Sequence, residues 1–320
     1  MPPSTSYDLI VIGAGQGGGP LAGTMAESGL RTALIERKHV GGTCVNEGCT
    51  PTKTMIASAR VAQYTLSLHD ALPILSRRAR DYGVEHGSVS VSMERVRERK
   101  RTVVESFRAS SRSSLEEKEN LDLLEGDARF TRTRTLEVDL EGGGRRTITG
   151  EKVIVNTGAR PLIPPIDGLR QVDHLDSTSI MELGEVPDHL LVLGGGYIGL
   201  EFGQMFRRFG ARVTIIQRAD QLLTREDADI AEAVAEILEE DGIEVLLSSE
   251  ATRAVQHGDG SIGLEVEGPE GTQTVEGSHL LVATGRRPNT DDLGLEEAGI
   301  ETDESGHVRV DEHLGTTAED

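Results

Sequence analysis

The chain is poor in aromatic side chains, in cysteine and in long apolar runs. Its 320 residues include no tryptophan, four tyrosines and five phenylalanines, so the core must be mainly aliphatic. Two cysteines are too few for a disulfide framework, and a close pair in a cytosolic chain is more typical of catalysis or metal binding. No apolar run approaches the roughly 18 residues of a membrane span, and the N-terminus lacks a basic leader. We therefore expect a cytoplasmic protein.

Basic side chains are also scarce. The 33 Lys and Arg residues are opposed by 54 Asp and Glu residues, which gives a formal net charge of −21 at pH 7. Such a charge repels the phosphate backbone of nucleic acids and anionic membrane surfaces. We therefore expect no nucleic-acid partner and no membrane partner. At about 150 residues per domain, the length predicts roughly two domains.

The chain repeats one order of elements. Residues 7–12 predict a short buried strand, a glycine-rich turn follows, and residues 20–29 and 32–37 predict a helix and a second strand. The same order returns over 189–218. This repetition predicts an α/β fold with two Rossmann-like dinucleotide-binding domains. Three further elements are expected: a charged helix over 92–119, antiparallel strands around a glycine turn over 136–158, and an amphipathic helix over 227–240.

The first turn carries the spacing Gly13-x-Gly15-x-x-Gly18, and Glu36 ends the second strand. The glycines allow a tight turn and close approach of a pyrophosphate, which the helix N-terminus stabilises. Glu36 can accept hydrogen bonds from a ribose. The motif with its flanking elements favours dinucleotide binding, and a glycine-rich structural turn is the alternative.

Both cysteines lie in the run GGTCVNEGCTPTK at 41–53. Four residues separate Cys44 from Cys49, and the intervening Asn and Gly can turn the chain tightly enough for a disulfide. Thr50 and Pro51 suit the start of a helix, so Cys49 is expected at a helix N-terminus that favours a thiolate, with Lys53 one turn later. The pattern favours a redox-active disulfide. A zinc site lacks two further soft ligands, and no metal site is expected; inert thiols are the remaining alternative.

This run resembles the redox segment of the flavin-dependent pyridine nucleotide-disulfide oxidoreductases, which include dihydrolipoamide dehydrogenase, glutathione reductase and mercuric reductase. Mercuric-reductase-like proteins show the closest resemblance. Four other segments resemble family motifs: GAGQGGGPLAG from 13, IVNTGARP from 154, GGGYIGLEFG from 194 and VATGRRPNT from 282. The resemblance implies an FAD-binding domain over 1–160 that resumes at 286–320, with an NAD(P)-binding domain over 161–285. It also implies a C-terminal dimerisation domain that is absent here, and a homodimer for the full-length protein.

The resemblance also implies roles for individual residues. Cys49 faces the flavin, and Cys44 is the thiol that meets the substrate. Lys53 lies near the flavin and pairs with Glu201, although two unconnected surface charges are the alternative. Tyr197 covers the isoalloxazine until the nicotinamide displaces it. Further residues expected to bind a cofactor are Arg37, Gly42, Thr43, Ala128, Thr157, Gly158 and Gly285.

The second glycine motif is Gly194-x-Gly196-x-x-Gly199, with Ile198 inside it. The position that carries a ribose-binding acid in NAD-preferring relatives is Gln217, and Arg218 follows. Without a carboxylate to repel it, a 2′-phosphate is tolerated, and an arginine can pair with it. The sequence therefore favours NADPH over NADH.

Together these features predict an enzyme, an FAD-dependent oxidoreductase that passes electrons from NAD(P)H through FAD to Cys44–Cys49 and on to a small disulfide or metal-ion substrate. The alternatives are an inactive truncated nucleotide-binding fragment and a dihydrolipoamide-dehydrogenase-like enzyme that uses NAD. Residues 64–76 interrupt a helical pattern with a proline, and we interpret the run LSLHDALPI within them as foreign, with a natural surface loop as the alternative.

Overall fold

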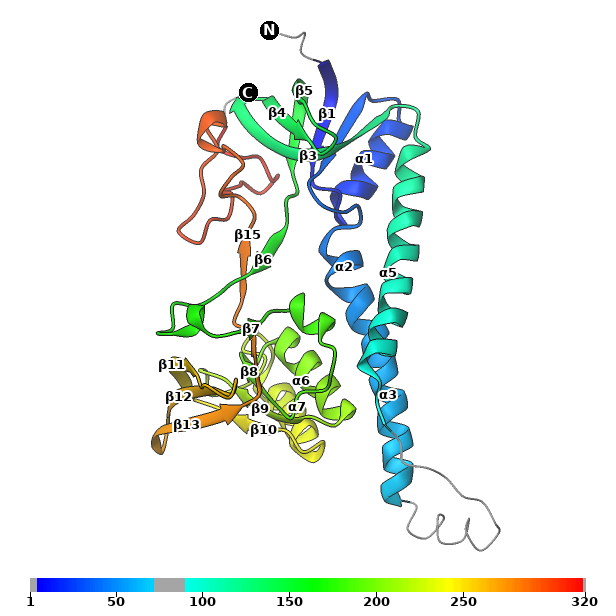
Figure 1. Cartoon of the computed structure of the whole chain (residues 1–320). Helices are drawn as coiled ribbons and strands as arrows, with labels where there is room; N and C mark the ends of the chain where they lie inside the picture. Colours follow the sequence, from blue (N-terminus) through cyan, green and yellow to red (C-terminus); the bar gives the residue numbers. More distant parts are fainter. Residues whose placement is uncertain (1–4, 72–89, 319–320) are drawn as a thin grey trace, which may run out of the picture. The chain divides into compact units, whose positions relative to one another are not determined.

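The structure is a computed structural model that describes residues 5–71 and 90–318 (Figure 1). The chain divides into two compact units. The first comprises Met1–Thr50, Thr102–Arg160 and Arg286–Asp320, and the second comprises Pro51–Arg101 and Pro161–Gly285. Residues 72–76 of the segment that contains the run interpreted as foreign lie outside the described residues.

The first unit contains a five-stranded sheet whose hydrogen bonds close into a ring. Strand β1 (Thr5–Ile12) pairs in parallel with β2 (Thr32–Glu36) and with β5 (Arg145–Val155), and β2 pairs in parallel with β3 (Leu121–Arg132). Strand β4 (Thr135–Leu140) closes the ring because it pairs antiparallel with both β3 and β5. The antiparallel strands expected around the glycine turn are confirmed.

Alternation along the strands of this sheet sends side chains into two separate cores. Leu9 and Val11 of β1 pack with Ala22 and Ala26 of α1 (Gly18–Glu27). Ile10, between Leu9 and Val11, packs in the opposite core with residues of the antiparallel strands and of the return segment. The apolar run in β1 is thus explained by burial on both faces.

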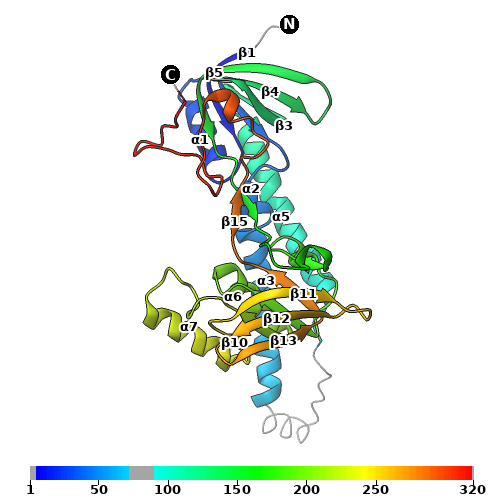
Figure 2. The same ribbon diagram turned by 90° about the vertical axis from the view of Figure 1, so that its left-hand side faces the viewer.

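The second unit contains a five-stranded parallel sheet with the order β10-β9-β8-β14-β7. Helices α6 and α7 lie beside this sheet in Figure 1, and the antiparallel sheet β11-β12-β13 appears in Figure 2. The strands are β7 (His174–Leu175), β8 (His189–Leu193), β9 (Arg212–Ile216), β10 (Glu244–Leu246), β11 (Glu250–Gln256), β12 (Ile262–Gly268), β13 (Gly271–Gly277) and β14 (His279–Val282).

Other elements are shorter or connect these sheets. The helices are α2 (Gly42–Asn46), α3 (Cys49–Ala71), α5 (Met93–Glu116), α6 (Tyr197–Phe209) and α7 (Ala228–Glu240). The 3-10 turns are η1 (Leu169–Gln171), η2 (Ser179–Glu182) and η3 (Glu296–Ala298), and β6 (Ala159–Pro161) pairs with β15 (Arg286–Pro288).

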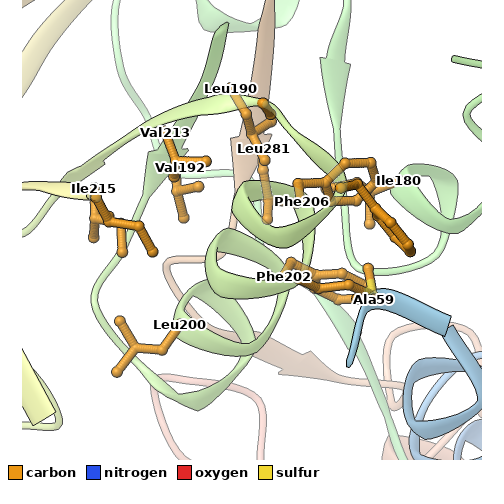
Figure 3. Packing of buried hydrophobic residues seen from close by; sticks show 14 of the residues in the cluster. Ala59, Ile180, Leu190, Val192, Leu200, Phe202, Phe206, Val213, Ile215 and Leu281 are labelled. Atoms are coloured by element: carbon orange, nitrogen blue, oxygen red, sulfur yellow. The ribbon is translucent and has the colours of Figure 1, made fainter. Parts of the chain in front are cut away.

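The parallel sheet of the second unit separates a helix-facing core from a core shared with the antiparallel sheet. Leu190 and Val192 of β8 pack with Phe202 and Phe206 of α6, as Figure 3 shows. Leu191, which points to the other face, packs with residues of β12. The rings of the buried Phe206 and of Phe209 meet edge to face with centroids 5.9 Å apart, a favoured arrangement for aromatic pairs.

One grouping differs from the domain boundaries expected from the sequence. Residues 51–101 belong to the second unit rather than the first. The physical reason is that Met55 and Ala59 of α3 and Met93 of α5 are buried in the same core as Phe202. The chain passes between the two units after Arg160 and after Gly285, and the FAD-binding and NAD(P)-binding domains stay predictions.

The predicted helices and strands lie within a few residues of the observed ones. Helix α6 ends at Phe209, followed by Gly210 with φ of 114°, the left-handed conformation that glycine adopts most easily at helix ends. Asp227, where a helix was expected to begin, is the N-cap residue of α7. Within residues 5–71 and 90–318, no helix combines the length and the apolarity needed to cross a bilayer.

We predict that acid destabilises the second unit through His189. This buried side chain has its Nε2 2.8 Å from Thr214 Oγ1, which donates to Glu244 Oε2 at 2.8 Å. Burial, and then the charge of Arg212, lowers the pKa of His189. The folded state therefore resists protonation more than the unfolded state does. Stability is complete above the ordinary pKa of about 6.5 and falls as the pH drops below it.

Thermal unfolding of the parent and of His189→Gln, followed from about pH 7.5 to about pH 5, measures this effect. The variant should lose less of its unfolding temperature on acidification, whatever its stability at neutral pH. The matched control is His313→Gln, which removes an exposed imidazole. Equal acid sensitivity of the parent and His189→Gln would contradict the prediction.

Candidate functional site

In the first glycine loop, the outer glycines are tightly packed against backbone, whereas the middle glycine has free space beside it. Gly13 has φ of 104°, and a methyl group there would collide with the carbonyl oxygen of Asn156. A methyl group on Gly18 would collide with the carbonyl oxygen of Gly13. At Gly15, by contrast, the nearest atom to an added Cβ is Gly42 Cα at 3.8 Å. The outer glycines thus allow helix and strand to approach, and the middle one leaves room for a ligand at the N-terminus of α1.

Glu36 is fixed beside this loop. Its Oε2 accepts a hydrogen bond from the backbone N–H of Ala14 at 2.8 Å, and its Oε1 accepts one from the N–H of Lys38 at 2.9 Å. The carboxylate therefore lies where the ribose of a dinucleotide is recognised in Rossmann-type sites. The residues present fit the adenosine and pyrophosphate part of FAD. Arg37, next to it, has its Nε 3.5 Å from Asp127 Oδ1.

The second glycine loop repeats this geometry. Gly194 has φ of 111°, and an added Cβ would lie 2.6 Å from the carbonyl oxygen of Ala283. A methyl group on Gly199 would collide with the carbonyl oxygen of Gly194, whereas an added Cβ at Gly196 would meet no atom within 4 Å. The residues present therefore also fit a second dinucleotide, at the N-terminus of α6.

Gln217 takes the place that Glu36 has in the first unit. Its Oε1 accepts a hydrogen bond from the backbone N–H of Gly195 at 3.0 Å, and its Nε2 donates to the carbonyl of Gln221 at 3.1 Å. The side chain is thus held like Glu36, but without charge. Arg218 is exposed, and its Nη1 lies 3.8 Å from Glu250 Oε1.

The two cysteines lie in consecutive helices of one segment. Cys44 is in α2, and Cys49 is the first residue of α3, as the sequence predicted for a thiol at a helix N-terminus. Burial, and then the neighbouring Cys49 side chain, raises the pKa of the Cys44 thiol, while the backbone N–H groups of Cys49 and Thr50 act in the opposite direction. The two cysteine side chains are close enough to hydrogen-bond to each other.

Asn46 holds the segment that carries these thiols. Its Nδ2 donates to the carbonyl of Val40 at 3.0 Å and to that of Gly42 at 2.9 Å. Its Oδ1 accepts a hydrogen bond from Arg108 Nε of α5 at 2.7 Å. Sequence reasoning assigned Asn46 to the turn but did not find Arg108, because a charged helix gives no sign of which arginine it turns inward.

Lys53 and Glu201 form an ion pair inside the second unit. Lys53 lies one turn into α3 and Glu201 lies in α6, and both side chains are at least two-fifths exposed. The expected pairing is therefore present, and the alternative of two unconnected charges does not hold. The role of the pair in catalysis stays a prediction.

The remaining residues predicted for FAD occupy edges and loops. Thr43 is exposed in α2, and Ala128 lies on β3 opposite Val138 of β4. The carbonyl oxygens of Thr157 and Gly158 accept hydrogen bonds from Asn289 at 2.9 and 3.0 Å. Asn289 thereby ties the return segment to the end of β5 within the first unit.

The structure brings together residues within each unit. The first unit holds the first glycine loop, Glu36 and both cysteines; the second holds Lys53, Glu201, Tyr197, Ile198, the second glycine loop, Gln217, Arg218 and Gly285. Sequence reasoning missed Asn156, whose side-chain Oδ1 would lie 3.3 Å from a Cβ at Gly17. Asn156 lies directly before Thr157 in the family-like segment IVNTGARP, and this position was the signal that could have identified it.

The fold and these sites define an α/β protein with two dinucleotide-type glycine loops, and comparison with known proteins gives the family. Residues 7–320 match the family model described as pyridine nucleotide-disulphide oxidoreductase, and the chain belongs to this family. The family and the α/β fold expected from the sequence are confirmed.

Two curated relatives and one solved structure illustrate the likeness. The mercuric reductase of Streptomyces lividans is 39% identical over 312 residues, covering 98% of this chain and 63% of that protein. The dihydrolipoyl dehydrogenase of Geobacillus stearothermophilus is 32% identical over 312 residues, covering 97% and 63%. The solved Cu(II) complex of the HOCl-induced flavoprotein disulfide reductase RclA from Escherichia coli has a TM-score of 0.83 and 36% identity, covering 98% and 64%.

This chain therefore spans slightly less than two thirds of the length of these relatives. The matched portion includes every motif described above, because the family match begins at residue 7 and extends to residue 320.

We predict that Gly196→Ala weakens dinucleotide binding without unfolding the protein. Gly196 has φ of −85° and ψ of 176°, which alanine adopts readily, and the added methyl group contacts nothing. That methyl group occupies the approach to the N-terminus of α6, so the Kd for NADPH should rise about tenfold or more, roughly 1.4 kcal/mol. Calorimetric titration measures the Kd.

Urea unfolding supplies the control for this experiment. The free energy of unfolding of Gly196→Ala should change by less than about 0.5 kcal/mol. Gly199→Ala, whose methyl group collides with the carbonyl oxygen of Gly194, should lose about 1–3 kcal/mol or more. A Gly196→Ala variant that binds NADPH as tightly as the parent would show that the open loop is not the binding site.

Proposed function

We propose that this chain is the FAD-binding and NAD(P)-binding part of a flavin disulfide oxidoreductase. The observation that carries the proposal is a pair of equivalent glycine loops in one chain, together with two interacting thiols at the start of a helix. Two dinucleotide sites and a dithiol are the components that hydride transfer followed by disulfide reduction requires. The chain's family membership supports this reading.

FAD, held at the first glycine loop and Glu36, would supply the two-electron chemistry that links a nicotinamide coenzyme to the thiols. Two-electron reduction of the Cys44–Cys49 disulfide, with one proton taken up, would leave a thiol and a thiolate. Cys44 then attacks an oxidised substrate, and Cys49 displaces the reduced product, which re-forms the disulfide. A small disulfide or a metal ion is the proposed substrate, since the relatives include mercuric reductases and a disulfide reductase.

The neighbouring side chains have proposed roles in positioning and charge. Lys53, oriented by Glu201, provides a positive charge toward the flavin, and Tyr197 covers the nicotinamide side until the coenzyme enters. The 1–160 and 286–320 segments bind FAD, and 161–285 binds the coenzyme. A cytoplasmic location, as expected from the sequence, is part of the proposal, and the family resemblance supports a homodimer for the complete protein.

NADPH is the proposed coenzyme. Gln217 keeps the position of a ribose-binding acid but is neutral, so it does not repel a 2′-phosphate. The exposed Arg218, whose nearest acidic partner is 3.8 Å away, is available for that phosphate.

We predict that the two thiols have different spectroscopic roles. If Cys49 faces the flavin, two-electron anaerobic reduction of the FAD-bound protein produces a long-wavelength charge-transfer band. Cys49→Ser should abolish the band, whereas the matched variant Cys44→Ser should retain or reveal it. Anaerobic titration followed by absorbance measures both. Identical spectra for the two variants would overturn the assignment.

We predict that coenzyme choice depends on Gln217 and Arg218. Arg218→Ala should weaken NADPH binding by about 1–3 kcal/mol and leave NADH binding nearly unchanged. Gln217→Glu should keep the hydrogen bond from Gly195, as Glu36 keeps the one from Ala14, but its charge should turn the preference toward NADH. Half-saturation of flavin reduction by each coenzyme is the measurement. A parent that prefers NADH would refute the proposal.

A further inference from the structure

Three hydrogen bonds, joined through the backbone of Gln221 and Glu226, connect Gln217 with Tyr197 in the second unit. Gln217 bridges the N–H of Gly195 and the carbonyl of Gln221. The Nε2 of Gln221 donates to the carbonyl of Glu226 at 3.2 Å. The carboxylate of Glu226 accepts a hydrogen bond from the hydroxyl of Tyr197, which follows the glycine loop directly. The chain of contacts therefore starts and ends at the same loop.

The segment that carries these contacts is firmly attached to the glycine loop. The N–H of Leu223 donates to the carbonyl of Gly195 at 3.0 Å, and an added Cβ at Gly195 would lie 2.5 Å from Leu222. Leu222 and Leu223 are both buried, and Leu223 holds a φ of 47°. A non-glycine residue adopts this conformation only where the surrounding structure requires it. The position of Glu226 is thus set by the fold.

Tyr197 is held by this carboxylate rather than by packing. The side chain is 60% exposed, so burial does little to fix the ring. The hydrogen bond to Glu226 raises the pKa of Tyr197, and the charge of Arg225 acts in the opposite direction. A charge-assisted hydrogen bond is about twice as strong as a neutral one. Glu226 therefore selects one orientation of an otherwise mobile phenol.

We propose that Glu226 is a positioning residue for Tyr197, and that a ligand at Gln217 releases Tyr197 through Gln221 and Glu226. This inference rests on the proposed function, since it needs a nucleotide at the second glycine loop. An adenosine 2′-phosphate at Gln217 competes for the amide that now donates to Gln221. Binding at the adenosine end thereby frees the Tyr197 side chain before the nicotinamide arrives.

The coupling has a thermodynamic consequence. If the ligand and the Tyr197–Glu226 contact exclude each other, removal of the contact must favour the ligand by the same factor. Adenosine 2′,5′-bisphosphate, which lacks the nicotinamide, should bind about fivefold more tightly to Glu226→Gln and to Tyr197→Phe than to the parent. The double variant should show no further gain, because both substitutions break one contact.

Fluorine NMR of the protein labelled with 3-fluorotyrosine reports on Tyr197 directly. The chain has four tyrosines and no tryptophan, and Tyr197→Phe assigns the resonance. Glu226→Gln should shift the Tyr197 resonance without ligand, whereas the matched substitution Glu236→Gln, on the exposed face of α7, should not. Tyr7, bonded to Asp122 in the first unit, is the internal control.

Titration of the labelled parent with adenosine 2′,5′-bisphosphate tests the coupling. The Tyr197 resonance should move toward its position in Glu226→Gln, and Gln221→Ala should abolish this movement while calorimetry still detects binding. A parent that binds the bisphosphate with an unchanged Tyr197 resonance overturns the inference and leaves the proposed function intact. A parent that shows no calorimetric binding overturns both, so the two failures are distinguishable.

Discussion

The structure depends on one close backbone contact, which the chain makes twice. The third glycine of each nucleotide-binding loop lies against the carbonyl oxygen of the first, Gly18 against Gly13 and Gly199 against Gly194. Because no side chain fits there, α1 and α6 begin directly at the carboxyl ends of β1 and β8. The middle glycine of each loop, Gly15 or Gly196, then leaves space beside the helix N-terminus, as the binding of a pyrophosphate requires. The redox roles proposed for the thiols, for the Lys53–Glu201 ion pair and for Tyr197 all require dinucleotides bound at these loops.

The two units use this contact for different purposes. Glu36 and Gln217 accept equivalent hydrogen bonds from Ala14 and Gly195, yet only Glu36 carries a charge. The neutral amide offers a donor that a carboxylate lacks, and this donor bonds the carbonyl of Gln221, in the segment whose Glu226 accepts from Tyr197. A single change of atom type, oxygen to nitrogen, therefore separates a charged acceptor from a neutral side chain that both accepts and donates a hydrogen bond.

Much of the fold followed from local patterns. The pattern of glycines next to short apolar runs predicted β1, α1, β8 and α6. Such a prediction is possible because strand burial and helix starts depend on neighbouring residues. The same reasoning placed Cys49 at a helix start and paired Lys53 with Glu201 through the family resemblance. It did not find Arg108, whose partner Asn46 is 62 residues away, nor the grouping of residues 51–101 with the second unit.

The sequence by itself determined the family, the two glycine loops and the chemistry available to them, since these depend on residue identity and spacing. Only the tertiary structure decided which charges meet and which polar atoms are already occupied. Glu226 illustrates the difference: in the sequence it is one of 54 acidic residues, and folding places its carboxylate on the hydroxyl of Tyr197. This contact depends on the path of the loop that follows the buried Leu222 and Leu223, and no local sequence pattern encodes the direction of that path.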